Sequence, residues 1–222
     1  NTNREAGMHY RYIVVEGSIG SGKSDLSRRL AEYFDALHLT ESPERNPFLE
    51  SFYMNASNHA LASELYFLMN RIEAVEVINV EEEKNHMIVA DFLLEKDQIF
   101  VPILLKDREP GNEQTLFWQI KHRMMPEMPV PDLVIYLQTS YEVTHKGLQK
   151  RNDGMLNMFP PGYLEMIHEE YGRFFHLYQN APVLIVNGDE MDFANNDDHF
   201  EMLLRAMSNM QGSRHYLNLS EA

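Results

Sequence analysis

The sequence predicts an α/β fold of three layers, in which a five-stranded parallel sheet is covered by helices on both faces. Short apolar runs alternate along the chain with stretches of helical length, and a glycine-rich loop separates the first apolar run from a helical pattern. Such runs are typical of strands that are buried on both faces of a parallel sheet. We expect the five strands at residues 12–15, 37–40, 87–90, 133–137 and 183–186.

The helices are predicted from the spacing of apolar residues. The longest is expected over residues 60–82, because five apolar residues there repeat at alternating steps of four and three and form one stripe. The stripe comprises Leu61, Leu65, Leu68, Ile72 and Val75. It is explained most simply as core, or as half of a homodimer interface. Another helix, over residues 163–178, begins after Pro160-Pro161-Gly162.

Length and composition fit a single domain over residues 1–222, since 44% hydrophobic residues are enough for a core. The chain has no cysteine, so neither a disulfide framework nor an oxidising compartment is indicated. Residues 1–7 are polar and show no signal-peptide pattern, and we expect residues 1–8 to form a flexible N-terminus. No later run approaches membrane-spanning length. These features predict a cytoplasmic protein.

The charge of the chain bears on its partners. With 19 basic and 34 acidic side chains, the net charge is -15. Binding of a nucleic-acid polymer rests on neutralising many phosphates, so this charge argues against such a partner. A small polyanion needs only a local basic pocket. The ten histidines show no metal-ligand spacing, and we interpret them as surface or packing residues.

The glycine-rich loop has the pattern of a phosphate-binding P-loop in its required context of strand before and helix after. It consists of Gly17, Ser18, Ile19, Gly20, Ser21, Gly22, Lys23 and Ser24. Glycines allow successive backbone N–H groups to surround a polyphosphate, at a helix N-terminus whose dipole favours anions. The Lys23 ammonium can reach the β and γ phosphates, and the Ser24 hydroxyl can bind Mg²⁺. The loop therefore predicts binding of ATP or GTP.

Two carboxylates help to decide the reaction, because Glu41 and Asp91 end the next two predicted strands. Open α/β sheets bind ligands at this edge. One carboxylate can accept a proton from an acceptor hydroxyl and the other can hold Mg²⁺ through water, which favours phosphoryl transfer to a hydroxyl. The guanine-reading Asn-Lys-x-Asp pattern of GTPases is absent, and the chain is too short for a helicase-like motor. The alternatives are that Glu41 is a solvated strand-end acid and that Asp91 caps a helix.

The segment from Glu41 to Leu49 resembles the Glu-Pro-x-x-x-Asn-Pro-Phe-Leu stretch of deoxynucleoside kinases. The resemblance implies that Glu41 is the general base and that Asp91 is the acidic residue of the family's Asp/Glu-Arg-Ser motif. It also implies four nucleoside-binding residues. These are Tyr53 at the sugar 3′-hydroxyl, Glu64 in place of a base-reading glutamine, Arg71 at the base and Asp97 at the base.

The resemblance covers nearly the whole chain. Residues 131–137 are similar to the strand before the family's lid, which implies a lid over about residues 146–160 with Lys150 and Arg151 at the phosphates. Residues 187–193 resemble the loop that lies against the adenine of ATP, which implies contacts from Asp192 and Phe193. For the lid pair the alternative is an ordinary solvated helix end.

Departures from the family pattern are equally clear. Phe92 and Leu93 replace the usual arginine and serine after the acidic residue, so one arginine that would touch the phosphates is missing. In the lid, Asp153 and Leu156 replace a frequent arginine and a sugar-binding glutamate. A non-catalytic nucleotide-binding protein is therefore one alternative. A nucleoside monophosphate kinase is another, although an acceptor phosphate needs positive charge, and between Glu41 and Phe92 only Arg45, Arg71 and Lys84 are basic.

The prediction is thus a P-loop kinase that transfers the γ-phosphoryl group of ATP to the 5′-hydroxyl of a deoxynucleoside. Lys23 and Arg151 are expected to stabilise the transferring group, and Ser24 and Asp91 to place Mg²⁺. Glu64 favours a purine, and deoxyguanosine above deoxyadenosine, because a carboxylate offers two acceptors to the adjacent N1–H and amino donors of guanine. The alternative is that Glu64 and Arg71 merely pair with each other.

Overall fold

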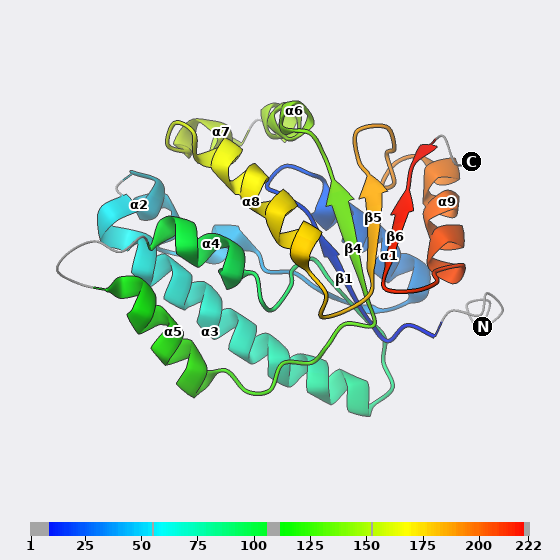
Figure 1. Ribbon diagram of the computed structural model, residues 1–222, viewed down its shortest axis with the longest axis horizontal. Coiled ribbons are helices and arrows are strands. Elements are labelled where there is room, and N and C mark those ends of the chain that lie inside the picture. Colours follow the sequence, from blue (N-terminus) through cyan, green and yellow to red (C-terminus); the bar gives the residue numbers. More distant parts are fainter. Residues whose placement is uncertain (1–8, 55, 106–111, 152, 220–222) are drawn as a thin grey trace.

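The computed structural model describes residues 9–54, 56–105, 112–151 and 153–219 and shows a parallel sheet with helices on both faces (Figure 1). Six strands in these residues form one sheet, in the order β2-β3-β1-β4-β5-β6. They are β1 (Tyr12–Glu16), β2 (Leu37–Leu39), β3 (Ile88–Ala90), β4 (Leu133–Gln138), β5 (Val183–Asn187) and β6 (Arg214–Leu217). Residues 1–8, expected to be flexible, and Asn152 of the expected lid lie outside the described residues.

The predicted number of five strands is wrong by one, because β6 has no apolar run to reveal it. Arg214 and His215 occupy its first half, and Leu217 is its buried residue. As an edge strand, β6 pairs only with β5, in a parallel register that sets Val183 opposite Arg214. Its side chains are only partly covered, so the polar residues cost little there. The five strands expected from the sequence are all present within one or two residues of their predicted ends.

The helices are α1 (Lys23–Phe34), α2 (Leu49–Met54), α3 (Ala56–Glu83), α4 (Asp97–Leu104), α5 (Glu113–Met124), α6 (Tyr141–Arg151), α7 (Met155–Met158), α8 (Tyr163–Leu177) and α9 (Asp197–Ser208). The longest helix, α3, begins four residues before its predicted start. Its apolar stripe belongs to the core, where Leu68 and Val75 are fully buried. None of the helices in the described part of the chain combines the length and apolar character needed to cross a membrane.

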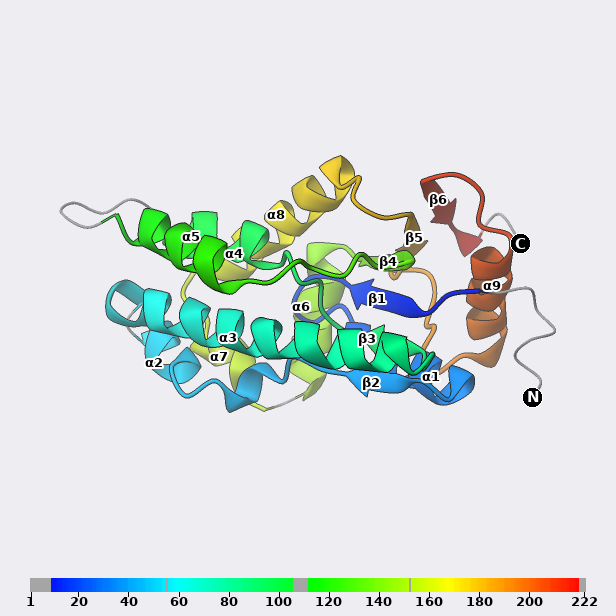
Figure 2. The same ribbon diagram turned by 90° about the horizontal axis from the view of Figure 1, so that it is seen from below.

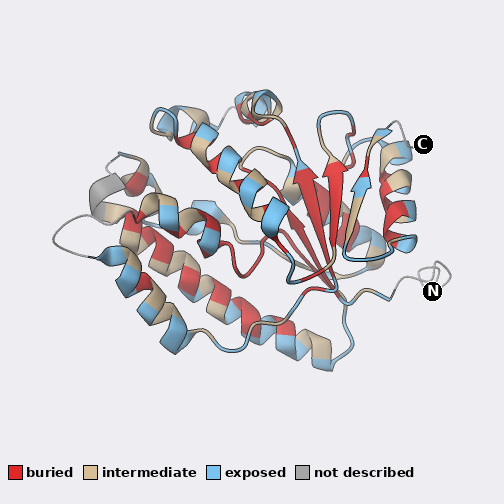
Figure 3. Ribbon diagram, in the orientation of Figure 1, coloured by how far each residue is buried: buried red, intermediate tan, exposed pale blue. Residues whose placement is uncertain are grey.

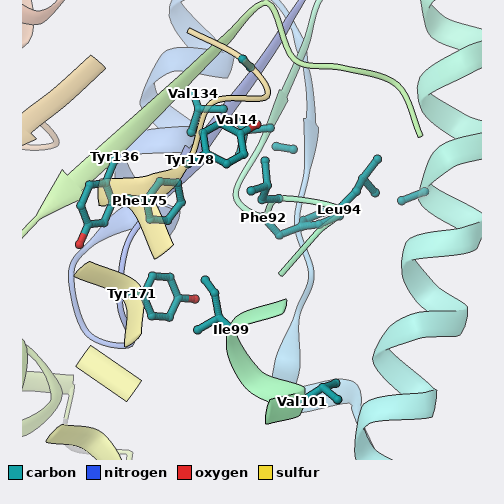
Figure 4. Close-up of a cluster of buried hydrophobic side chains, with 14 of the residues drawn as sticks. Val14, Phe92, Leu94, Ile99, Val101, Val134, Tyr136, Tyr171, Phe175 and Tyr178 are labelled. Carbon is teal, nitrogen blue, oxygen red and sulfur yellow. The ribbon is translucent and has the colours of Figure 1, made fainter. Parts of the chain in front are cut away.

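The central strands β3, β1, β4 and β5 are buried on both faces, which explains their continuous apolar sequences (Figure 3). Ile13 and Val15 of β1 face a core shared with α1 and α9, whereas Tyr12 and Val14 face a larger core shared with α3, α4 and α8. Figure 2 gives a second view of the helices around the sheet. Figure 4 shows part of the larger core, in which Val14 lies near the ring of Tyr178, the residue that follows α8. The alternation of neighbouring residues between two cores makes three layers.

The topology places the ends of three adjacent strands side by side. In the parallel register of β1, β2 and β3, Val14 and Leu39 both lie opposite Ala90. The glycine-rich loop follows β1, Glu41 follows β2 and Asp91 follows β3. The carboxyl ends of parallel strands meet at one edge of a sheet, so these three segments converge on one place.

Candidate active site

The loop from Gly17 to Ser24 connects β1 to α1 and has the backbone geometry of a phosphate cradle. Gly20 and Gly22 adopt φ angles of 85° and 91°, a left-handed conformation that side chains disfavour. Gly22 is the N-cap of α1, so the first amides of the helix face the loop. Ser21 donates its backbone N–H to the Ser18 carbonyl at 3.0 Å and closes the turn. An anion in this loop would meet unpaired N–H groups and the positive end of a helix.

The P-loop lysine is held within the protein. The Lys23 Nζ lies 2.9 Å from Glu16 Oε1 and 3.0 Å from the Gly17 carbonyl oxygen. Glu16 is fully buried, and its second oxygen accepts the Leu93 backbone N–H at 3.1 Å. Burial alone would raise the pKa of the Glu16 carboxyl, but the ammonium groups of Lys23 and Lys96 hold it below its ordinary value. A bound polyphosphate would compete with Glu16 for Lys23.

Asp91 joins the P-loop helix to the end of β2. Its Oδ2 accepts hydrogen bonds from Ser24 Oγ at 3.2 Å and Thr40 Oγ1 at 2.8 Å, and its Oδ1 accepts the Glu41 backbone N–H at 3.0 Å. The described residues contain no cluster of three or more histidine, cysteine or acidic side chains suited to a metal. A hydroxyl beside one carboxylate fits Mg²⁺, which keeps several waters and binds through substrate phosphates rather than in an all-protein cage.

Glu41 lies between two cations. Its Oε1 is 3.2 Å from Arg71 Nε and 3.1 Å from Arg71 NH2, and its Oε2 is 2.9 Å from Lys96 Nζ. The side chain is 6% exposed. Burial alone would raise the pKa of Glu41, but Lys96 and Arg71 together lower it to about 2. Glu41 is therefore ionised at neutral pH, and each of its oxygens keeps a lone pair that could accept a proton.

The predicted base-reading residues also converge. Arg71 projects from α3, where it is 2% exposed, and its NH1 lies 3.8 Å from Asp97 Oδ2 at the start of α4. Lys121 of α5 binds the other oxygen of Asp97 at 2.8 Å. Within this cluster, three buried atoms have no hydrogen-bond partner: Glu64 Oε2, Arg71 NH1 and Asp97 Oδ2. Buried polar atoms without partners are costly, so this cluster is suited to a polar ligand.

Glu64 differs from the other carboxylates of the site in its charge. Burial raises the pKa of Glu64 to about 7. The Arg71 guanidinium lowers this pKa, whereas the carboxylates of Glu41 and Asp97 raise it further. Arg71 forms its ion pairs with Glu41 and Asp97, which differs from a simple pairing of Glu64 with Arg71. Tyr53 of α2 lies close by, with its ring 5.8 Å from that of Tyr163. At neutral pH, Glu64 is near the midpoint between a carboxylate and a carboxylic acid.

The predicted lid residues lie at the surface. Lys150 and Arg151 end α6 with exposed side chains, and Arg151 NH2 lies 3.0 Å from Asp153 Oδ2. The body of α6 nevertheless contacts the P-loop, because a Cβ on Gly147 would lie 2.7 Å from the Gly20 carbonyl oxygen. Helix α6 thus rests on the loop, while Arg151 at its end pairs with a near neighbour in the chain.

The loop after β5 is fixed by its own contacts. Asp192 Oδ1 accepts the Asn195 backbone N–H at 3.2 Å, and the Asp192 N–H donates to His199 Nδ1 at 2.9 Å. Phe193 is 2% exposed and its ring packs in the core shared with α1 and α9. Because the Phe193 ring is used in packing, only the backbone of this residue could contact adenine, and the contact itself stays a prediction.

Three charged residues of the site were not identified from the sequence. Glu16 ends the strand before the P-loop, where a carboxylate among apolar residues could have been noticed. Lys96 immediately precedes Asp97, but the resemblance implies a role for Asp97 alone. Lys121 lies on α5, and no sequence pattern around it indicates a role in the site, because its partner Asp97 is on another helix.

The comparisons with known proteins agree with this geometry. The family model described as deoxynucleoside kinase matches residues 13–211. The chain belongs to the deoxynucleoside kinase family. It is a phosphotransferase of that family, in which a nucleotide such as ATP is the phosphate donor and a deoxynucleoside is the acceptor.

Several characterised deoxynucleoside kinases are similar over most of their length. A deoxyguanosine kinase of Bacillus subtilis is 28% identical, over 86% of this chain and 93% of its own. A deoxyguanosine kinase of Lactobacillus johnsonii is 29% identical, over 90% and 92%. A deoxyadenosine kinase of Lactobacillus acidophilus is 27% identical, over 83% and 88%.

Among solved structures, the deoxyadenosine kinase of M. mycoides with bound dATP has a TM-score of 0.73 at 21% identity, over 89% of this chain and 99% of that chain. The same kinase with bound dCTP has a TM-score of 0.72. At this identity the likeness shows the fold, and it confirms the predicted α/β kinase architecture.

Proposed function

We propose that this deoxynucleoside kinase transfers the γ-phosphoryl group of ATP to the 5′-hydroxyl of a purine deoxynucleoside, with Glu41 as the general base. The observation that carries the proposal is the position of Glu41. Its carboxylate is ionised and buried between the P-loop lysine region and the cluster of Glu64, Arg71 and Asp97. A hydroxyl bound beside it would have an acceptor for its proton, and a phosphate on the P-loop would be within the same site.

The donor end of the site follows from the P-loop. Lys23 and the loop amides would bind the ATP phosphates, and Arg151 would add a charge from the lid. Ser24 and Asp91 would hold Mg²⁺, which supplies positive charge to the phosphate oxygens when bound. Asp192 and the backbone of Phe193 would lie at the adenine. Tyr53 would contact the sugar, since its ring adjoins Tyr163 near Glu64.

The proposed purine preference rests on the buried atoms of the cluster that have no hydrogen-bond partner. Arg71 NH1 can donate to a purine N7 or to guanine O6, and Asp97 Oδ2 can accept from an amino group. The ionised form of Glu64 accepts two adjacent donors, which guanine presents as N1–H and its amino group. The protonated form donates once and accepts once, as adenine requires. Because the pKa of Glu64 is about 7, we expect the preference for deoxyguanosine to increase with pH. The names of the relatives, deoxyguanosine and deoxyadenosine kinases, support a purine.

The test is to measure kcat/KM for the four deoxynucleosides with ATP and Mg²⁺, in the wild type and in Glu64→Gln, at pH 6 and pH 8.5. We expect the guanine-to-adenine ratio of the wild type to rise with pH and to fall about ten- to hundredfold in the variant at high pH. A pyrimidine preference, or an unchanged ratio in the variant, contradicts the assignment of Glu64. ATP binding without transfer to any deoxynucleoside would favour the non-catalytic alternative.

An acceptor that already carries a phosphate is less well matched. Lys96 and Lys121 add two cations to those counted from the sequence, but Lys96 is paired with Glu41 and Lys121 with Asp97. A monophosphate would have to displace one of these carboxylates. A neutral hydroxyl needs no such exchange.

We also propose that the enzyme is a homodimer that associates through the outer face of α3, and that it is cytoplasmic. The inner stripe of the helix is used by the core, but Met69, Val77 and Val80 are 39–47% exposed on the opposite side. These positions fall on one helical face. Sedimentation of the wild type and of a Val77→Glu/Val80→Glu variant tests the assembly, and a monomeric wild type contradicts it.

A further inference from the structure

At position 92 the chain has phenylalanine where the family that it resembles has arginine. The structure shows that the Phe92 ring is buried and that a nearby lysine faces the site. Phe92 is 3% exposed and packs in the larger core with Leu94 (Figure 4). A cation at that backbone position would have to enter the core. Four residues later, at the entrance to α4, Lys96 turns toward the site instead. Its Nζ is 2.9 Å from Glu41 Oε2.

Lys96 lies between the proposed base, Glu41, and the P-loop lysine, Lys23. On one side it binds Glu41, the proposed base. On the other side it neighbours the Tyr171 hydroxyl, which lies 3.5 Å from Lys23 Nζ. A connected series of groups therefore runs from the P-loop lysine through Tyr171 and Lys96 to Glu41. A phosphoryl group that passes from ATP at Lys23 to a hydroxyl at Glu41 must cross the space beside this series.

The groups around Lys96 keep its ammonium group protonated. Burial alone would lower the pKa of its ammonium group, but the carboxylates of Glu16 and Glu41 hold that pKa well above its ordinary value. The side chain is 9% exposed and extends past the ring of Phe100, 5.7 Å from the ring centroid. Lys96 is thus a fixed, fully charged donor with little solvent around it, which is where an ammonium group acts most strongly on developing negative charge.

We propose that Lys96 is a catalytic residue of this kinase, supplying positive charge to the transferring phosphoryl group and to the attacking 5′-oxygen, and that it replaces the cation missing at position 92. This inference rests on the proposed function. In the step, the 5′-oxygen forms a bond to the γ-phosphorus and the bond to the β-phosphate bridging oxygen breaks, leaving ADP. The hydroxyl proton goes to Glu41. Lys96 keeps its own proton and donates hydrogen bonds only.

The first experiment compares Lys96→Met with Lys96→Arg and with a matched control, Lys121→Met. Both lysines are buried and bind a carboxylate of the same site, but Lys121 lies at the base end, against Asp97. Lys96→Met should lower kcat about 10²- to 10³-fold with nucleoside KM changed less than about fivefold. Lys96→Arg should recover part of kcat. Lys121→Met should chiefly raise nucleoside KM, by about tenfold.

A second readout needs no turnover and separates this proposal from the proposed function. ADP with aluminium fluoride and Mg²⁺ mimics a phosphoryl group in transfer, and its binding can be measured by calorimetry. Lys96→Met should weaken binding of the mimic at least tenfold relative to ADP alone, with ADP binding and the melting temperature near those of Lys121→Met. Equal affinity for the mimic in wild type and variant overturns the proposal, as does a kcat within threefold of the wild type. An inactive wild type whose binding of the mimic still depends on Lys96 would contradict the deoxynucleoside assignment instead.

Discussion

The buried charged residues Lys23, Glu41 and Lys96 and the basic end of the predicted lid carry the same kinds of charge in opposite surroundings. Lys23, Glu41 and Lys96 have side-chain exposures of 15%, 6% and 9%, and each is held by a partner from another segment. In the lid, Arg151 is 53% exposed and its partner Asp153 is only two residues away. The fold itself positions the first set, whereas a local contact holds the second. Glu41 and Lys96 are therefore in place before ligands bind, whereas Lys23 would have to leave Glu16, and Arg151 would have to leave Asp153, to bind a phosphate.

The largest effect should come from the centre. Lys23→Ala is expected to lower phosphoryl transfer on the order of 10³-fold, because the loop loses its charge at the ATP phosphates. Initial-rate assays with the best deoxynucleoside measure it. Arg28→Ala is the control, since Arg28 is an exposed residue of α1 that pairs with Asp25. Undiminished transfer in Lys23→Ala would mean that the loop does not bind the donor.

Glu41→Gln should lower kcat about 10²-fold or more while ATP binding stays nearly intact, since only proton acceptance is lost. The same residue predicts acid sensitivity. The pKa of Glu41 is depressed to about 2 in the folded state, so its stabilising contribution is present above its ordinary value near 4.5 and is lost as pH falls through 2. Urea unfolding between pH 5 and pH 2 should show a smaller loss of stability in Glu41→Gln. Normal turnover by Glu41→Gln would contradict the assignment of Glu41 as the general base.

Glu64 should show the opposite pH dependence. Its pKa is raised to about 7 in the folded protein, so its contribution to stability is fully present below about pH 4.5 and is lost as pH rises through 7. Glu64→Gln removes this dependence and should gain up to about 3 kcal/mol relative to the wild type between pH 4.5 and pH 8. Denaturant titrations at both pH values test this. Glu76→Gln, on the exposed side of α3, controls for the change in charge. If the unfolding free energies of all three proteins change with pH in parallel, the raised pKa of Glu64 is refuted.

The smallest effects belong to the lid. Arg151→Ala should lower kcat about tenfold if the residue reaches the phosphates. Asp153→Ala frees Arg151 from an exposed ion pair worth about 0.2–1 kcal/mol, so it should raise kcat/KM for ATP at most about fivefold. Steady-state kinetics of the two variants and of the double variant decide the point. If Asp153→Ala acts equally with and without Arg151, the pair has no part in ATP binding.

Local sequence signals predicted the features that depend on neighbouring residues. The P-loop, the strand-end acids Glu41 and Asp91 and the central strands all follow from short patterns. The partners of those acids did not, because Lys96 lies 55 residues from Glu41 and the topology of the sheet alone brings them together. The edge strand β6 escaped for another reason, since a strand covered on few sides needs no apolar run. Phe193 was placed by family likeness, whereas its burial depends on packing against α1 and α9.

The contact between Gly20 and Gly147 places α6 directly on the P-loop. Backbone meets backbone there, with a position for Cβ on Gly20 only 2.6 Å from the Thr144 carbonyl oxygen and one on Gly147 only 2.7 Å from the Gly20 carbonyl oxygen. The Leu148 side chain also lies there, 2.9 Å from the same position on Gly20, so a shift of the P-loop would press on both the backbone and a side chain of α6. The two glycines thus let α6 lie directly on the P-loop, and a single methyl group at either position would force the two segments apart.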